Sequence, residues 1–377
     1  MILRLIPSVV LLSFAWNLIA SAQCGAPEQH VQSSDGAADD DFGGKVALSG
    51  DVAVITAHDD DDLGKDSGSA YVFRRVGGVW VETQKLVASD GSKNDGFGVS
   101  VATDGARIAV GSLRVGVGAV YVFENNGAQW VETQILAPGD LLPGDGFALS
   151  LALEGDWLLA GAPFQAFQRG SVYAFQRQAG AFVQVQKIEP VFGKGVANFG
   201  NSISLDGSRF AASAPTQGLA ILFLDGGGGW IEQVRLTGPD TVPGDGFGDG
   251  VSLKGNRLVC GAIMHAHPGT GVRGGAVYVF ERIGANWSFQ EEIQPPFPTS
   301  SGRFGRLLAQ DQDRILTGQR ISDSVYVFEP GPLTWTMTRI LSPSGGRNFG
   351  AAFAVDGDQA LVGDTTIGNL QGICLAG

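Results

Sequence analysis

One stretch of nineteen residues occurs twice in this chain with few changes. The sequence GSAYVFRRVGGVWVETQKL covers residues 68–86, and GAVYVFENNGAQWVETQIL covers residues 118–136. Such internal repetition predicts a fold built from one supersecondary unit, because each unit has to bury its apolar surface against the next. The repeat therefore constrains the architecture more strongly than any single motif.

Seven copies of the unit begin at a phenylalanine that is usually followed by glycine. These residues are Phe42, Phe97, Phe147, Phe199, Phe247, Phe304 and Phe349. The intervals of 45–57 residues each contain four short runs, such as FGVSVATDG, RIAVGS, GAVYVF and QWVETQIL. The runs are rich in β-branched and aromatic residues and are bounded by Gly, Asn or Asp, which predicts β-strands.

Four strands per unit of this length are typical of a β-propeller blade. Each small sheet is apolar on both faces, so a closed ring satisfies every unit, whereas an open row leaves two apolar ends exposed. All five tyrosines occupy one position of the third strand, which indicates a repeated packing role. We therefore expect an all-β protein in which residues 23–377 form a single seven-bladed propeller of four-stranded antiparallel blades.

The last unit ends at Gly377 without a tryptophan-bearing fourth strand, and residues 29–43 align with residues 84–98. We therefore expect residues 23–35 to complete the last blade and to close the ring. This arrangement makes Cys24 and Cys374 neighbours, and it predicts a disulfide between them in an oxidising compartment. The third cysteine, Cys260, lies in the apolar run RLVCGA and is predicted to be a buried free thiol.

Residues 1–22 have the pattern of a secretory signal peptide: Arg4, an apolar run, and a small-residue cleavage site at residues 20–22. A membrane anchor is the alternative. Removal of this segment, with its single positive charge, changes the formal charge from −13 to −14. So acidic a chain disfavours binding to nucleic acid. From the signal pattern we expect a secreted, extracellular, periplasmic or cell-surface protein with no membrane span after cleavage.

The units resemble the FG-GAP repeats of integrin α-chain heads and of exported bacterial proteins. Phenylalanine opens each unit, and Gly-Ala-Pro closes the second strand, most clearly as Phe147 with residues 161–163 and as residues 199–200 with residues 214–215. The resemblance covers residues 29–377 and implies a seven-bladed propeller. Integrin-type repeats carry calcium loops between the first and second strands, but here that connection is short, as at residues 104–105, so those sites are not carried over.

The densest acidic cluster, HDDDDLGKDSG, covers residues 58–68. Asp59, Asp61 and Asp66 loosely follow a calcium-loop spacing, although Leu63 stands where a further oxygen ligand is expected. Calcium is one hypothesis for this loop, and a solvated acidic loop is the other. A second acidic pattern recurs between units, and its repetition favours a turn-capping role. It comprises Asp35 and Asp40, Asp90 and Asp95, Asp140 and Asp145, and Asp240 and Asp245.

Several residues of the loops between second and third strands are candidates for contact with a partner, because variable loops on a rigid scaffold carry function. Phe164, Phe167 and Arg169 form an aromatic and cationic group that suits protein or glycan. His265 and His267 can share a metal, but their loop contains no carboxylate or cysteine, so an exposed loop is the simpler interpretation.

The sequence contains no Gly-x-Ser-x-Gly motif and no glycine-rich phosphate loop before a helix. We therefore expect a monomeric, non-catalytic binding or cell-surface interaction module for protein or glycan, with calcium optional. Two alternatives stay open. One is an enzyme, such as a polysaccharide lyase or hydrolase, with a site at the central channel, and the other is a purely structural surface protein.

Overall fold

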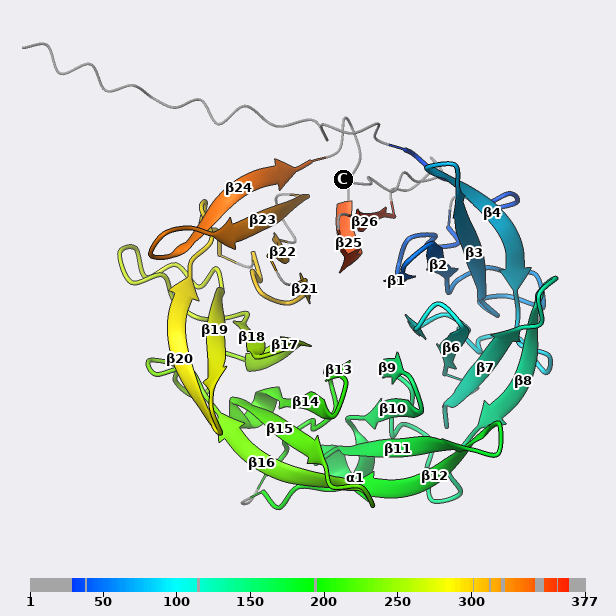
Figure 1. Ribbon diagram of the computed structural model, residues 1–377, viewed down its shortest axis with the longest axis horizontal. Coiled ribbons are helices and arrows are strands. Elements are labelled where there is room, and N and C mark those ends of the chain that lie inside the picture. The colour runs from blue at the N-terminus through cyan, green and yellow to red at the C-terminus, as the bar shows by residue number, and fades with distance from the viewer. Residues whose placement is uncertain are drawn as a thin grey trace, which may run out of the picture.

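The fold is a ring of small antiparallel sheets around a central axis (Figure 1). The computed structural model describes residues 29–37, 39–113, 116–192, 195–300, 302–311, 313–319, 323–342, 349–357 and 359–365. Within these residues there are six four-stranded blades and one two-stranded sheet, and in every blade the strands are hydrogen-bonded in chain order. The all-β class and the propeller architecture expected from the sequence are therefore confirmed.

The six blades follow one another along the chain. The first three blades consist of β1 (Val46–Ser49), β2 (Val52–Ala57), β3 (Ser69–Val76) and β4 (Val79–Leu86); β5 (Ser100–Thr103), β6 (Arg107–Ser112), β7 (Ala119–Asn125) and β8 (Trp130–Leu136); and β9 (Ser150–Glu154), β10 (Trp157–Ala162), β11 (Ser171–Gln178) and β12 (Ala181–Ile188). The next three consist of β13 (Ile203–Asp206), β14 (Arg209–Ala214), β15 (Leu219–Asp225) and β16 (Trp230–Leu236); β17 (Phe247–Lys254), β18 (Arg257–Ala262), β19 (Ala276–Ile283) and β20 (Asn286–Ile293); and β21 (Leu308–Gln310), β22 (Ile315–Gln319), β23 (Ser324–Pro330) and β24 (Trp335–Leu341). The two-stranded sheet contains β25 (Phe349–Asp356) and β26 (Gln359–Asp364), and the only helical turns in the described residues are α1 (Gln165–Gln168) and the 3-10 helix η1 (Pro215–Gln217).

The hydrophobic core lies between neighbouring sheets rather than at one centre. Phe147, for example, is fully buried in a cluster that joins the second and third blades. Its ring contacts that of Tyr173 edge to face, with ring centroids 5.4 Å apart. The same contact recurs with centroid distances of 5.3 Å for Phe97 and Tyr121 and 5.5 Å for Phe247 and Tyr278. The repeated Phe and Tyr thus have the packing role that the sequence predicts.

The repeated glycines let adjacent blades approach closely. A Cβ atom added to Gly161, the first residue of the Gly-Ala-Pro motif, would lie 2.1 Å from the carbonyl oxygen of Gly200. Gly200 follows the phenylalanine of the next unit and has a φ of +85°, which favours glycine. Gly363 of β26 stands in the same relation to Gly43, which precedes the first blade. The paired motifs are therefore the two sides of one contact between blades.

The prediction of seven four-stranded blades is wrong, because the described residues form six such blades and the β25–β26 sheet has only two strands. Residues 29–36 contain no strand, and none of them is paired with that sheet. Instead, the side chain of Gln29 accepts a hydrogen bond from the backbone of Trp80 and donates one back, each 2.7 Å long. Gln84 and Trp130 make the same pair of contacts. The aligned residues therefore share this side-chain clamp, but Gln84 lies in the paired strand β4, whereas Gln29 lies in a segment without a strand.

Other expectations concern the ends of the chain. The predicted signal peptide at residues 1–22 and the predicted disulfide between Cys24 and Cys374 lie outside the described residues. Cys260 is buried and free, as predicted. No helix among the described residues is long and apolar enough to cross a membrane.

Candidate functional site

Two sets of connections share one face of the ring, which we call the loop face. The first set joins the second and third strands of a blade, and the other joins one blade to the next. Gly170 pairs with Phe199, and Gly275 pairs with Phe304, in isolated parallel bridges between the two sets. Side chains from a loop and from the following connection can therefore converge on one site.

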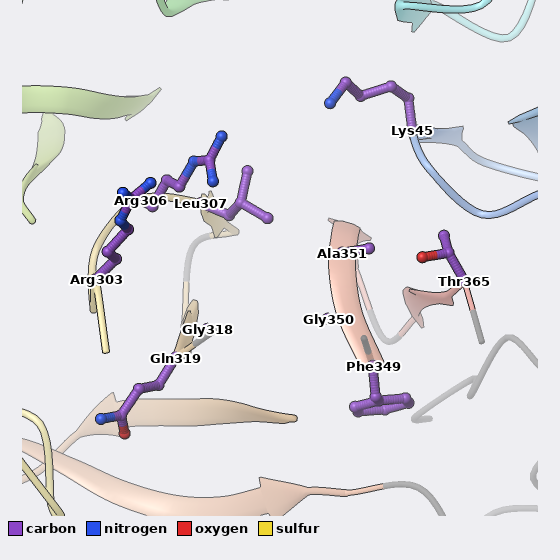
Figure 2. Close-up of a pocket in the computed structure, with 10 residues that line it drawn as sticks. All are labelled: Lys45, Arg303, Arg306, Leu307, Gly318, Gln319, Phe349, Gly350, Ala351 and Thr365. Carbon is purple, nitrogen blue, oxygen red and sulfur yellow. The ribbon is translucent and has the colours of Figure 1, made fainter. Parts of the chain in front are cut away.

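A pocket opens at the centre of the loop face, where the sixth blade, the β25–β26 sheet and the first blade meet (Figure 2). It encloses about 230 Å³. Its lining residues lie at the starts of β1, β21 and β25 and at the ends of β22 and β26. They are Lys45, Arg303, Arg306, Leu307, Gly318, Gln319, Phe349, Gly350, Ala351 and Thr365. The pocket therefore forms the mouth of the central channel.

Three cations line this pocket, and none of them forms an ion pair with a carboxylate of the described residues. Burial lowers the pKa of Lys45, and the charge of Arg306 lowers it further, while Asp41 opposes the shift. Nearby, burial raises the pKa of Asp249, although the charges of Arg306 and Arg303 act against this change. The mouth is thus electropositive in a chain whose formal charge is −13.

This cationic pocket was not predicted from the sequence, although the repeat contains a signal for it. Arg306 and Asp249 each lie two residues after a repeated phenylalanine, and Lys45 lies three residues after another. These positions begin the innermost strand of each unit, so their side chains can face the axis. A comparison of the charges at these positions across the units would have identified the channel.

The acidic loop at residues 58–68 is held by internal contacts. The Asp61 carboxylate accepts a hydrogen bond from the backbone of Asp66 at 2.7 Å, and Asp59 lies 3.6 Å from His58. A group of three potential metal ligands in the described residues occurs elsewhere and contains none of Asp59, Asp61 and Asp66. Calcium binding by this loop stays a prediction.

The second acidic pattern has two structural roles. Asp40, Asp95, Asp145 and Asp245 each accept a hydrogen bond from the backbone N–H three residues earlier, at 2.5–3.0 Å. The predicted turn-capping role is thus confirmed for these four. The other members, Asp35, Asp90, Asp140 and Asp240, accept the hydroxyl of the repeated tyrosine at 2.6–2.9 Å.

The aromatic group on the third blade is exposed. Phe167 is 96% exposed and Phe164 is 43% exposed. The backbone of Ala166, Phe167 and Gln168 has a positive φ of 52–66°, which is rare for residues other than glycine. Arg169 donates a hydrogen bond to the backbone of Phe192 at 3.3 Å. The structure therefore presents two aromatic rings on a tight turn of the loop face.

The two histidines lie in different surroundings. His265 is buried, contrary to the expectation of an exposed loop, and its Nδ1 lies 2.9 Å from Asp245 Oδ2. Its Nε2 lies 3.4 Å from Glu292 Oε1 and 3.7 Å from Asp240 Oδ2. His267 uses its Nδ1 to accept a hydrogen bond from the backbone of Gly269 at 3.2 Å. The carboxylates beside His265 come from other segments, so the loop sequence alone could not reveal them.

Comparisons with solved structures agree with this architecture at low sequence identity. A chain in the crystal structure of the mitotic checkpoint complex is 13% identical, with a TM-score of 0.61, and the match covers 93% of this chain and 91% of that chain. A putative 6-phosphogluconolactonase from Bacteroides uniformis is 13% identical, with a TM-score of 0.58 and coverages of 82% and 88%. The WD40 repeats of RRP9 are 13% identical, with a TM-score of 0.55 and coverages of 86% and 90%. These similarities concern the fold alone.

Family-level comparison is more specific. No curated protein matches the chain. The family model for the FG-GAP repeat matches residues 27–73, 80–123, 130–175 and 230–280. Each matched segment contains one of the phenylalanines that mark the units. The repeated contact between Phe-Gly and Gly-Ala-Pro glycines gives these matches a structural basis, and the chain belongs to the FG-GAP repeat family.

Proposed function

We propose that this chain is an exported, monomeric, non-catalytic binding module that holds an anionic group of a glycan at the channel mouth of the loop face. One observation carries the proposal: Lys45, Arg303 and Arg306 share a pocket and have no ion-pair partner among the described residues. Acidic sugars such as uronates provide a carboxylate together with hydroxyl groups. The side chain of Thr365 lines the same pocket, and its hydroxyl can hydrogen-bond to a sugar hydroxyl.

The electrostatics favour an anionic ligand. Like charges held together in a partly enclosed site repel one another, and a bound carboxylate relieves that repulsion. Arginine suits this role because its planar group can donate two parallel hydrogen bonds to a carboxylate. The acidic remainder of the chain repels anions, so the ligand is directed to the mouth rather than to the surface at large.

Calorimetric titration with oligomers of acidic and neutral sugars tests the proposal. We expect the wild-type protein to bind uronate oligomers, with an affinity that falls as salt concentration rises, and to bind neutral oligomers weakly. Because a hydrogen bond to a charged group contributes about 1.5–3 kcal/mol, Arg306→Gln should weaken binding roughly 10-fold to 100-fold. The matched control is Arg75→Gln, which changes an exposed arginine at the end of β3.

The proposal fails if acidic and neutral oligomers bind equally, or if Arg75→Gln weakens binding as much as Arg306→Gln does. Cleavage of the oligomer during the titration would favour the alternative of an enzyme with a site at the channel. Asp249, whose pKa burial raises, is the acid to test in that case, and Asp249→Asn should then abolish cleavage while the oligomer still binds. A purely structural surface protein would bind none of these ligands.

A second candidate function is protein binding at the aromatic turn. Phe167 is almost fully exposed beside Phe164 and Arg169, and exposed aromatic and arginine side chains are typical of protein interfaces. We expect Phe167→Ala to reduce recovery of a partner in a quantitative pull-down without a change in melting temperature. Val76→Ala, which alters an exposed residue at the end of β3, should leave recovery unchanged. Equal recovery by all three proteins would contradict this second function.

A further inference from the structure

A cluster on the fifth blade combines an imidazole with carboxylates that converge from three segments. Asp240 precedes β17, His265 follows β18, and Glu292 lies in β20. One ligand atom of each residue lies within 4.8 Å of the others. The cluster lies on the loop face, but it is separate from the pocket at the channel mouth, and its interpretation does not depend on the proposed function.

The corresponding position in two other blades is occupied by a cation. In the first blade, Lys85 lies opposite Tyr71 in the strand register, and its Nζ is 2.8 Å from Asp35 Oδ2. In the third blade, Lys187 lies opposite Tyr173, and its Nζ is 2.8 Å from Asp140 Oδ2. In both blades the lysine neutralises the aspartate that accepts the tyrosine hydroxyl.

In the fifth blade no lysine occupies the position opposite the tyrosine. Asp240 accepts the hydroxyl of Tyr278 at 2.8 Å, as its counterparts do, but Glu292 takes the lysine's place in the strand register. Two carboxylates therefore face one another, and His265 is the basic residue of the described chain that forms an ion pair with them. The site thus has the charge of a cation-binding site.

The imidazole of His265 is oriented for coordination through Nε2. Its Nδ1 lies 2.9 Å from the buried carboxylate of Asp245, which is itself held by Arg273 at 3.1 Å and by the backbone N–H of Val242 at 3.0 Å. When Nδ1–H donates to Asp245, the lone pair of Nε2 faces Glu292 and Asp240. A carboxylate that orients a histidine in this way is a common feature of metal sites.

The distances between the three ligand atoms suit a tetrahedral metal ion. Metal–ligand bonds of roughly 2.0–2.2 Å place neighbouring ligand atoms of such a site about 3.3 Å apart. Nε2 lies 3.4 Å from Glu292 Oε1 and 3.7 Å from Asp240 Oδ2, close to this separation, and the three ligand atoms all lie within 4.8 Å of one another. An imidazole nitrogen with two carboxylate oxygens favours Zn²⁺ or a similar transition-metal ion over Ca²⁺ or Mg²⁺, which prefer oxygen ligands. We propose that Asp240, His265 and Glu292 bind one divalent transition-metal ion, with Asp245 as the positioning residue.

Three protein ligands leave a fourth position of a tetrahedral ion open. The Asp240 side chain is 51% exposed, so this position is accessible from the loop face. Water or a donor atom of a ligand can fill it. The proposed ion would therefore be accessible to small molecules, unlike a closed structural site made of four protein ligands.

Zinc titration of the EDTA-treated full-length protein by calorimetry tests this site, with Ca²⁺ in a parallel titration. We expect one high-affinity Zn²⁺ per chain, weaker binding of Ca²⁺, and a rise in melting temperature with Zn²⁺. Asp245→Asn should weaken zinc binding roughly 10-fold to 100-fold, because it removes the positioning carboxylate. Co²⁺ bound in place of Zn²⁺ should give the visible absorption of a tetrahedral site.

The decisive variant is Glu292→Lys, which restores the lysine of the first and third blades. This protein should fold, because the new ammonium group can pair with Asp240, yet it should lose the zinc-dependent rise in melting temperature. His267→Ala is the matched control and should bind Zn²⁺ as the wild type does, since His267 lies outside the cluster. If the wild type binds no Zn²⁺, or if Glu292→Lys binds it equally well, the proposal is overturned.

Discussion

Phe147→Ala is expected to lower the free energy of unfolding by about 3–5 kcal/mol, the range typical of large-to-small substitutions at buried aromatic residues. Phe147 is fully buried between the second and third blades and contacts the rings of Tyr173 and Phe175. Its removal leaves a cavity with rigid walls, because the surrounding strands are fixed by hydrogen bonds on both sides. Guanidinium denaturation followed by circular dichroism measures the effect.

The matched control is Phe167→Ala, which removes the same atoms from a side chain that is 96% exposed. Surface substitutions of this kind usually change stability by less than about 0.5 kcal/mol. If Phe147→Ala lowers the free energy of unfolding no more than Phe167→Ala does, the repeated phenylalanine does not hold neighbouring blades together. The packing described above would then be incorrect.

Gly161→Ala is expected to destabilise the protein by about 1–3 kcal/mol, as overpacking in a rigid core commonly does. The added Cβ atom would lie 2.1 Å from the carbonyl oxygen of Gly200, which is much shorter than a van der Waals contact. The position of the added Cβ is fixed by the backbone, and it meets a backbone oxygen, so no change of rotamer can relieve the clash. The two blades would have to separate, which weakens the burial of their shared apolar side chains.

Gly139→Ala provides the comparison, because a Cβ atom at this exposed glycine meets nothing within 4 Å. We expect this control to have wild-type stability or slightly higher, since alanine reduces the entropy of the unfolded chain. Thermal melting of the two variants side by side is sufficient. Equal melting temperatures for Gly161→Ala and the wild type would contradict the contact between the Phe-Gly and Gly-Ala-Pro motifs.

Much of the candidate site could not be predicted from the sequence. Asp240, His265 and Glu292 are separated by 25 and 27 residues, and no motif links them. Their proximity depends on the pairing of β19 with β20, which places Glu292 opposite Tyr278. It also depends on the hydrogen bond from Tyr278 to Asp240 and on the loop after β18, which places the His265 ring against that of Tyr278. Similarly, Lys45 and Arg306 lie far apart in the chain, and only the curvature of the ring brings them to one pocket.

Some features followed from local sequence alone. The alternating and apolar runs, bounded by glycine and aspartate, specify strands through the two-residue period of side chains in a β-sheet. The repeated Phe, Tyr and Gly specify how one blade contacts the next, because these residues pack within and between adjacent units. Cys260 could be assigned to the core because it lies within an apolar run. The family resemblance rested on the same short-range patterns.

The number of complete blades was decided by tertiary structure. Residues 29–43 align with residues 84–98 because the glutamine–tryptophan contact recurs, but Gln84 lies in β4 whereas Gln29 lies outside any strand. The sequence did not show this difference. Among the described residues, the six four-stranded blades and the two-stranded sheet between the sixth and the first are defined by the backbone hydrogen bonds between adjacent strands of each sheet. Local sequence determines the strands and how each unit contacts the next. Closure of the ring, and the proximity of charged residues that are distant in sequence, depend on the geometry of all units together.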